Sequence, residues 1–170
     1  MTFSTTLLHL PADPLGWSGR LLVPAEVVSG LGHDGKRRYV VEVEGLPAWH
    51  CALSSDGAGG HYVIFSKERR RALEAAGLDP ARLTVRLAAD DSPYGAPVPE
   101  EFAAVLASDP LAEAYFRELT PGRQRNLLYL VGRYKTSDTR LRKAVAVAEY
   151  LLEVRGRMDF KELGAWMRGR

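Results

Sequence analysis

The sequence predicts an α+β protein in which a small β-barrel is followed by a helical C-terminal segment. Apolar residues alternate with a period of two over short stretches in the first half of the chain. Turn-forming residues separate these stretches, and beyond a Pro-, Gly- and Asp-rich segment at residues 89–98 the apolar period becomes helical. Strands this short must close on themselves or pack together to hide their edges, and a small barrel does so economically.

About six strands of four to nine residues are expected from the alternation. They cover residues 3–10, 17–23, 38–43, 49–53, 62–65 and 83–87. In the fifth stretch, Tyr62 and Ile64 are the apolar residues that repeat with a period of two. The glycines at 57, 59 and 60 precede that stretch and predict a hairpin, because a phosphate-binding loop would need a helix after the glycines.

Two short helices interrupt the expected strands. Pro24 suits the first helical position before residues 25–28, and Gly30 and Gly32 end that turn. Ser66 is expected to cap a helix over residues 67–76, where Gly77 offers a left-handed stop.

Helical signals fill the last third of the chain. Short helices are expected over residues 99–106, over 110–119 with Asp109 as cap, and from 121 to about 134. Asp138 is expected to cap a longer helix over 139–154, and Asp159 with Glu162 resembles a capping box before a last helix. One apolar face of the longer helix is expected to carry Leu141, Ala144, Val145, Ala148 and Leu152.

Bulk composition favours a cytoplasmic globular protein. The 170 residues suit one domain, or one domain with a small appendage. The single cysteine, Cys51, leaves no internal disulfide and suits a reducing compartment. The first residues lack the charged and apolar regions of a secretory signal, and the sequence has no apolar run long enough for a membrane span.

The net charge of +2 hides an asymmetry along the chain. Residues 1–120 carry 11 Lys and Arg against 16 Asp and Glu, whereas residues 121–170 carry 12 against 5. A basic C-terminal segment is consistent with an anionic ligand or nucleic acid as partner. The alternative, which we favour, is a solvated helix pair with salt bridges to the acidic half.

The sequence predicts no catalytic residue, metal site or cofactor. His50 and Cys51 are neighbours in an expected strand, so their side chains point to opposite faces and cannot chelate one ion. Neither a C-x-x-C nor an H-E-x-x-H spacing is present, and there is no G-x-S-x-G nucleophile motif. Cys51 lies among apolar residues, where a buried and inert thiol is expected.

The most distinctive stretch supplies five candidate residues for binding an anion or a partner. They are Lys135, Thr139, Arg140, Arg142 and Lys143. Cations near a helix N-terminus are unfavourable unless an acidic group offsets them, which predicts either a carboxylate of the barrel or an external anion as partner. Arg140 and Lys143 share a helix face, and Arg142 points elsewhere. The favoured interpretation is that these residues dock the helices on the barrel.

The C-terminal segment resembles the YdeI/OmpD-associated, or bacteriocin-protection, family. The residues that carry the resemblance are Val98, Pro99, Phe102, Leu106, Pro110, Ala112, Phe116 and Leu119, followed by Arg125, Tyr129, Lys135, Thr139, Arg140 and Arg142. The resemblance implies helices packed against a barrel. It also implies a link to resistance against antimicrobial peptides and to an outer-membrane porin.

The N-terminal part resembles the small barrel domain of unknown function that often precedes this segment. The matching residues are Trp17, Val23, Pro24, Leu31, Gly32, Trp49, Leu53, Gly57, Gly60, His61, Lys67, Arg70 and Leu78. This resemblance implies a double-split β-barrel, a topology shared with AbrB/MazE-like transcription factors. The chain departs from the pattern at Ala81-Arg82, where relatives often have Gly-Asp before the last strand.

These observations predict a barrel domain at residues 1–90, a linker at 91–98 and a helical segment at 99–170. The expected function is a non-enzymatic binding or stress-protection protein of the bacteriocin-protection type. A nucleic-acid-binding regulator that uses the basic tail is the alternative. A third possibility is an enzyme that anchors a small anionic substrate with Arg140 or Lys135.

Overall fold

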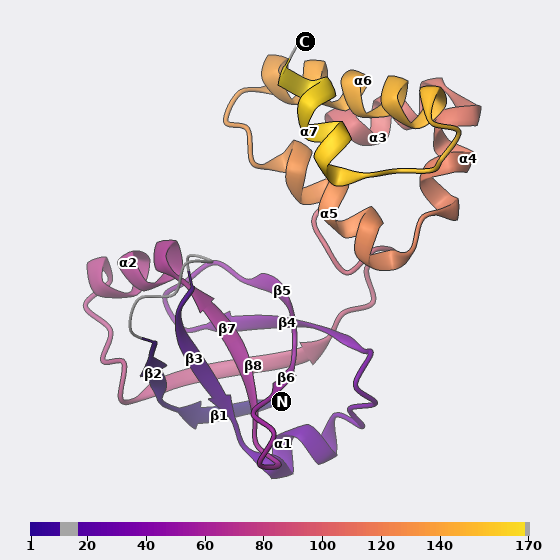
Figure 1. Cartoon of the computed structure of the whole chain (residues 1–170). Coiled ribbons are helices and arrows are strands. Elements are labelled where there is room, and N and C mark those ends of the chain that lie inside the picture. The colour runs from indigo at the N-terminus through magenta and orange to yellow at the C-terminus, as the bar shows by residue number, and fades with distance from the viewer. Residues whose placement is uncertain (11–16, 169–170) are drawn as a thin grey trace. The chain divides into compact units, whose positions relative to one another are not determined.

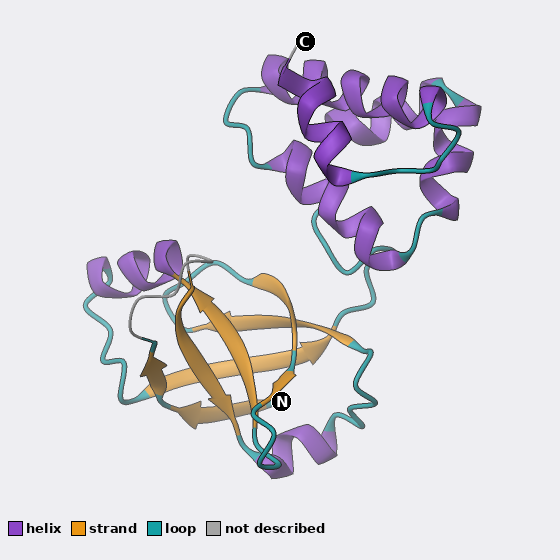
Figure 2. Ribbon diagram, in the orientation of Figure 1, coloured by secondary structure: helices purple, strands orange, loops and turns teal. Residues whose placement is uncertain are grey.

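The computed structural model describes residues 1–10 and 17–168, and these form two compact units, Met1–Asp91 and Ser92–Arg170. Within the described residues the first unit contains all the strands and two helices, and the second unit is helical (Figures 1 and 2). The predicted α+β class is therefore confirmed. No helix in the described ranges is both long enough and apolar enough to span a bilayer.

The first unit contains two four-stranded antiparallel sheets. Its elements are β1 (Thr2–Thr5), β2 (Leu7–His9), β3 (Trp17–Val23), α1 (Ala25–Gly30), β4 (Arg38–Val43), β5 (Trp49–Ala52), β6 (Ser54–Ser55), β7 (His61–Ser66), α2 (Lys67–Ala75) and β8 (Leu83–Ala89). The first sheet has the order β1-β8-β4-β5, and the second has the order β2-β3-β7-β6. Both sheets contribute to one core, in which Tyr39 and Leu87 of the first sheet join Leu21 and Phe65 of the second.

Two stretches of chain pass from one sheet to the other. Only Thr6 separates β1 of the first sheet from β2 of the second, and only Leu53 separates β5 from β6. At the first crossing the Thr5 hydroxyl donates to the carbonyl of Leu22 at 2.8 Å, and the Leu22 amide donates to the carbonyl of Thr6 at 3.4 Å. The single strand expected over residues 3–10 is therefore two strands, because the chain bends at Thr6 to change partners.

Strand β7 buries the face opposite to the expected one. Its core residues are Val63 and Phe65, whereas Tyr62 and Ile64 lie on the outer face. All four residues are apolar, so alternation alone cannot choose between the faces. The choice is made by the register with β3, which pairs Val63 with the buried Leu21.

The expected hairpin before β7 is confirmed. The Asp56 amide donates to the carbonyl of Gly60 at 3.0 Å, and the Asp56 carboxylate accepts hydrogen bonds from the amides of Ala58 and Gly60. Gly57 and Gly59 have φ angles of 81° and 91°, which a residue with a side chain rarely adopts.

The second unit is built around one long helix. Its elements are α3 (Glu100–Ser108), α4 (Pro110–Glu118), α5 (Pro121–Gly132), α6 (Ser137–Glu153) and α7 (Phe160–Arg168). Helix α6 contacts the other four helices. The core combines Phe102 of α3, Phe116 of α4, Leu128 of α5 and Leu151 of α6 with Leu163 of α7.

Several helix caps lie where the sequence places them. The Ser66 side chain accepts the amide hydrogen of Arg69, and the Asp109 carboxylate accepts those of Leu111 and Ala112. The Asp159 carboxylate accepts from the amides of Lys161 and Glu162. Each cap satisfies N–H groups that have no partner inside the helix.

Helix α6 differs from the expectation in its start. The helix begins at Ser137, and its cap is Thr136, whose hydroxyl oxygen accepts the amide hydrogen of Thr139 at 3.3 Å. The expected cap, Asp138, instead lies in the first turn. Both residues have capping side chains, so composition alone does not distinguish them.

The buried face of α6 also differs from the expectation. Ala144 and Ala148 are buried as expected, but Leu141 and Val145 are exposed, and the buried stripe continues through Val147 and Leu151. The core of this helix therefore lies on a neighbouring face, because surrounding helices on several sides bury small alanines as well as larger residues.

Candidate functional site

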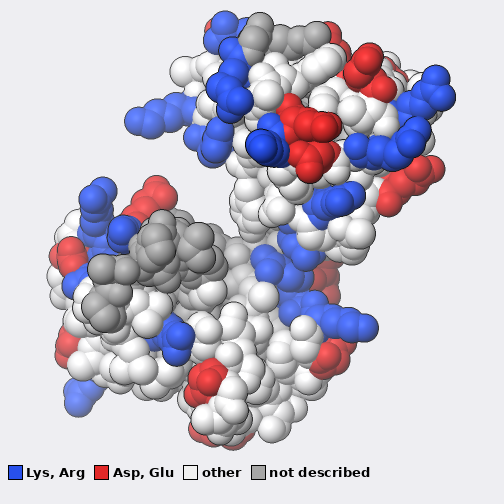
Figure 3. Space-filling model, in the orientation of Figure 1, with Lys and Arg blue, Asp and Glu red and all other residues white. Residues whose placement is uncertain are grey.

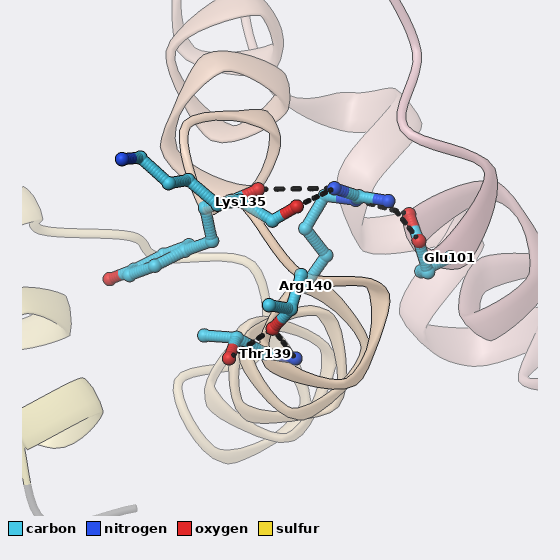
Figure 4. A network of polar contacts seen from close by, with 6 residues as sticks. Glu101, Lys135, Thr139 and Arg140 are labelled. Carbon is cyan, nitrogen blue, oxygen red and sulfur yellow. Dashed lines mark hydrogen bonds and ion pairs between the residues drawn. The ribbon is translucent and has the colours of Figure 1, made fainter.

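Arg140 at the start of α6 forms a two-pronged ion pair with Glu101 of α3 (Figure 4). Its Nε donates to Oε2 of Glu101 at 2.9 Å, and its Nη2 donates to Oε1 at 2.8 Å. The remaining Nη1 donates to the carbonyl oxygens of Tyr134 and Lys135 at 3.1 and 3.2 Å. One guanidinium thus joins α3, the end of the α5–α6 loop and α6, in the fork geometry that makes arginine–carboxylate pairs strong.

The ion pair changes the acidity of both partners. Hydrogen bonds from Arg140, and secondarily from Ser137, lower the pKa of Glu101 to about 2. The hydrogen bonds to Glu101 raise the pKa of Arg140. Both groups therefore stay charged across the neutral pH range, and the ion pair links α3 to α6 throughout this range.

The other four candidate residues have different surroundings. The Nζ of Lys143 donates to the carbonyl of Met167, at the end of α7, at 2.7 Å. The Thr139 hydroxyl accepts from that of Thr136 at 2.8 Å and from Arg142 at 3.4 Å. Lys135 is exposed, and its side chain points away from the ion pair (Figure 4). The structure therefore does not bring the five side chains together.

The partner of Arg140 corrects one expectation. The sequence predicts a carboxylate of the barrel or an external anion, but the carboxylate belongs to Glu101 in the helical unit itself. Lys143 likewise binds a carbonyl of the helical unit. These contacts hold helices to each other, which sequence spacing could not reveal because Glu101 and Arg140 are 39 residues apart.

A groove of about 970 Å³ adjoins this ion pair. Helix α5 supplies one wall through Asn126, Tyr129, Leu130 and Arg133, which recur at the spacing of one helix face. The extended segment 97–99 and the first turn of α3 also line the groove, as does Phe160 at the start of α7. Sequence reasoning missed this site, although the i, i+3, i+4, i+7 stripe on α5 is visible in the sequence.

Large apolar side chains are unusually exposed in the groove. Val98, Tyr129 and Phe160 keep 39%, 42% and 39% of their surface accessible. Exposed polar residues, Glu100 and Asn126 among them, also line the groove. An apolar lining with a few polar groups is the usual composition of a ligand-binding site.

A glycine lies at the point where α5 approaches Pro99 in the groove wall. Gly132 is the last residue of α5 and lines the groove, and a Cβ atom placed on it would lie 3.3 Å from the Cγ atom of Pro99. That distance is tighter than an ordinary van der Waals contact, so a side chain here would press on the segment that precedes α3.

Two histidines and the cysteine of the first unit are hydrogen-bonded or buried. The Nδ1 atom of His50 lies 2.7 Å from the carboxylate of Asp90, and that of His33 lies 2.9 Å from the Tyr39 hydroxyl. Burial raises the pKa of the Cys51 thiol to about 12. Among the described residues, no group of three or more His, Cys, Asp or Glu side chains is placed to hold a metal ion.

Charged side chains of both signs are visible on the helical unit. On the face shown in Figure 3, several Lys and Arg side chains gather along the left edge of this unit, and Asp and Glu side chains lie near basic ones at its centre and right. Local pairs such as Arg117 with Glu113, at 2.6 Å, contribute to this mixing.

Comparisons with known proteins find a similarity in the helical segment alone. No curated protein and no solved structure matches the chain. Residues 96–153 match the model of a family described as Bacteriocin-protection, YdeI or OmpD-Associated. The match contains α3, α4, α5 and α6, and with them the ion pair and most of the groove lining. Residues 96–153 of this chain, about a third of its length, are therefore similar to the bacteriocin-protection, YdeI or OmpD-associated family.

Proposed function

We propose that the chain is a non-enzymatic binding protein of the bacteriocin-protection type, and that the groove of its helical unit binds an apolar segment of a peptide. The observation that carries this proposal is the exposure of Val98, Tyr129 and Phe160 around one groove. Burying such side chains against a ligand contributes about 25 cal/mol per Å² of apolar surface removed from water.

The shape of the groove favours a peptide over a small molecule. Small-molecule sites usually enclose most of their ligand, whereas the walls of this groove remain largely accessible. The stripe from Asn126 to Arg133 spans two helical turns, or about 10 Å. That length matches about three residues of an extended chain. The implied link of the family to antimicrobial peptides agrees with this ligand class.

The electrostatics of the groove support binding over acid–base catalysis. Glu101 and Arg140 both line the groove, but each is held in its charged form by the other. A general acid or base needs a pKa near the working pH, and the pKa of Glu101 is about 2. The pair therefore serves to fix α3 against α6 and to keep the groove wall in place.

The proposal is tested by titrating the full ¹⁵N-labelled chain with tetrapeptides that contain two large apolar residues. We expect amide shifts at Val98, Tyr129 and Phe160, and binding about tenfold weaker or worse in Tyr129→Ala. Leu111→Ala is the matched control, because Leu111 is an apolar residue of α4 that is 54% exposed and does not line the groove. Equal losses in both variants, or no shifts at millimolar peptide, would refute a peptide groove.

Two further measurements distinguish peptide binding from nucleic-acid binding and from catalysis. DNA or RNA retention that weakens steeply with added salt would favour the nucleic-acid-binding alternative. Turnover in a broad substrate screen that is lost in Tyr129→Ala but retained in Leu111→Ala would favour an enzyme. Either result would replace the peptide-binding proposal.

We also propose that the two sheets of the first unit close into the double-split barrel that the resemblance implies. The path of the chain supports this proposal, because both edge strands of the first sheet continue into edge strands of the second. Strand β1 continues through Thr6 into β2, and strand β5 continues through Leu53 into β6. Strands that change sheets through such bends form the corners of packed sheets. Backbone nuclear Overhauser effects linking β1 to β3 and β5 to β7 are expected. Their absence from both corners would leave an open sandwich.

A further inference from the structure

The second sheet of the first unit is apolar on its outer face as well as on its core face. Six side chains of four strands form this outer face, called here the β3–β7 face: Leu8, Arg20, Leu22, Ser54, Tyr62 and Ile64. The register places Leu8, Arg20 and Ile64 in one row and Leu22, Tyr62 and Ser54 in the next. Leu8 and Leu22 keep 46% and 37% of their surface accessible.

The outer face of the first sheet is more polar. Its rows contain Thr2, Arg86 and Glu42, then Ser4 with Thr84, although a further row of Ala88, Val40 and His50 is partly apolar. Arg86 and Glu42 form an ion pair at 3.6 Å. An antiparallel sheet with one solvated face normally has polar residues on that face, as the first sheet does. Strands that are apolar on both faces are typical of sheets that are covered on both faces.

Arg20 is the one charged side chain of the β3–β7 face. Its guanidinium lies over the Tyr62 ring, with its Cζ atom 4.5 Å from the ring centre. Its Nε atom is buried without a hydrogen-bond partner, and no ion pair of Arg20 is found within residues 1–10 and 17–168. A buried donor without an acceptor is costly, and a carboxylate is the acceptor that an arginine binds most strongly.

We propose that the β3–β7 face binds an amphipathic helix of a partner protein, and that a carboxylate within the apolar stripe of that helix pairs with Arg20. The size of the face suits one helix. Strands are about 4.8 Å apart, so the face is about 15 Å wide, and a helix with its side chains is about 10 Å across. Apolar contact with Leu8, Leu22 and Ile64 supplies affinity, and the charge pair sets the orientation of the helix.

A second copy of the chain fits this face less well than a helix. Two copies related by a two-fold axis would bring two Arg20 side chains into one small interface without an intervening anion. Strand addition is also disfavoured, because the edge strands β2 and β6 are three and two residues long.

The test uses two synthetic helical peptides that differ at one position. Each has leucines along one face, with glutamate in the centre of that face in the first peptide and lysine in the second. Titration of the full ¹⁵N-labelled chain is expected to shift the amides of Leu8, Arg20, Leu22 and Ile64. The glutamate peptide is expected to bind about tenfold more tightly than the lysine peptide, because like charges in the contact are repulsive.

A charge-reversal variant checks the role of Arg20. In Arg20→Glu the preference is expected to reverse in favour of the lysine peptide, whereas Arg86→Glu, on the polar outer face of the first sheet, is expected to keep the original preference. Equal affinity of both peptides for the β3–β7 face would overturn the proposal, as would an absence of shifts on this face at millimolar peptide. Concentration-dependent broadening of the same amides without peptide would overturn it in favour of self-association. Shifts at Val98, Tyr129 and Phe160 report the groove of the helical unit, so they are evaluated separately and test only the proposed peptide groove.

Discussion

The ion pair between Arg140 and Glu101 predicts an unusually low pKa for the Glu101 carboxyl group. The hydrogen bonds from Arg140 lower the pKa of Glu101 from its ordinary value of 4.5 to about 2. We therefore expect the carboxyl carbon of Glu101 to titrate near pH 2 in the folded chain. The assay is a ¹³C chemical-shift titration of the carboxyl groups, with Glu101 assigned by its disappearance in Glu101→Gln.

The same shift fixes the sign of the pH dependence of stability. The folded pKa of Glu101 is lower than the unfolded one, so the pair stabilises the folded chain fully above pH 4.5. This stabilisation is lost progressively as the pH falls from about 5 towards 2. The free energy of unfolding of the wild type is therefore expected to fall more steeply over that interval than that of Arg140→Gln.

The variant Arg140→Gln also supplies the control for the titration, because it keeps a hydrogen-bonding side chain and removes the charge. In this variant the pKa of Glu101 is expected to rise towards 4.5. A titration midpoint of Glu101 near pH 4.5 in the wild type, or the same midpoint in both proteins, would refute the interpretation of the pair as a strong ion pair. If the wild type unfolds before pH 2, Glu101 is still expected to remain ionised up to the onset of unfolding.

Three other outcomes follow from buried and capping groups. Phe102→Ala removes a fully buried ring that packs edge-on against Phe116, with ring centres 5.4 Å apart. In urea denaturation it is expected to cost about 3–5 kcal/mol of unfolding free energy, and a loss below about 1 kcal/mol would contradict the packing. Asp109→Ala is expected to cost about 1 kcal/mol in the same assay, whereas Asp109→Asn, which keeps a capping oxygen, is expected to cost less. Cys51 is expected to resist a thiol reagent at pH 8 in the folded chain and to react with it in denaturant. The reason is that burial raises the pKa of the thiol to about 12. Rapid reaction in the folded chain would contradict this expectation and show that strand β5 opens.

Features set by neighbouring residues were predictable from the sequence. The caps at Ser66 and Asp109 depend on side chains within three residues of the amides that they accept from, so the local pattern suffices. The stripe of Leu83, Val85 and Leu87 was equally clear, because polar residues alternate with it. The start of α6 was placed two residues late, since Thr136 and Asp138 offer similar caps.

Features set by distant residues were not predictable. The buried face of β7 depends on its register with β3, and the buried face of α6 depends on the positions of four other helices. For the same reason the partner of Arg140 could be expected to be acidic, but its identity as Glu101 required the packing of α3 on α6. The groove on α5 is a further case, because the exposure of Tyr129 follows from which helices leave it uncovered.

The glycine at the end of α5 shows how close packing and helix propensity oppose each other at one residue. An alanine at position 132 would favour the helix by about 1 kcal/mol. Its methyl group, however, would displace the proline ring on the opposite side by a few tenths of an ångström. A gain in helix stability would then come with a change in the spacing of two groove walls. At position 132, helix propensity and the spacing of the groove walls therefore favour different residues.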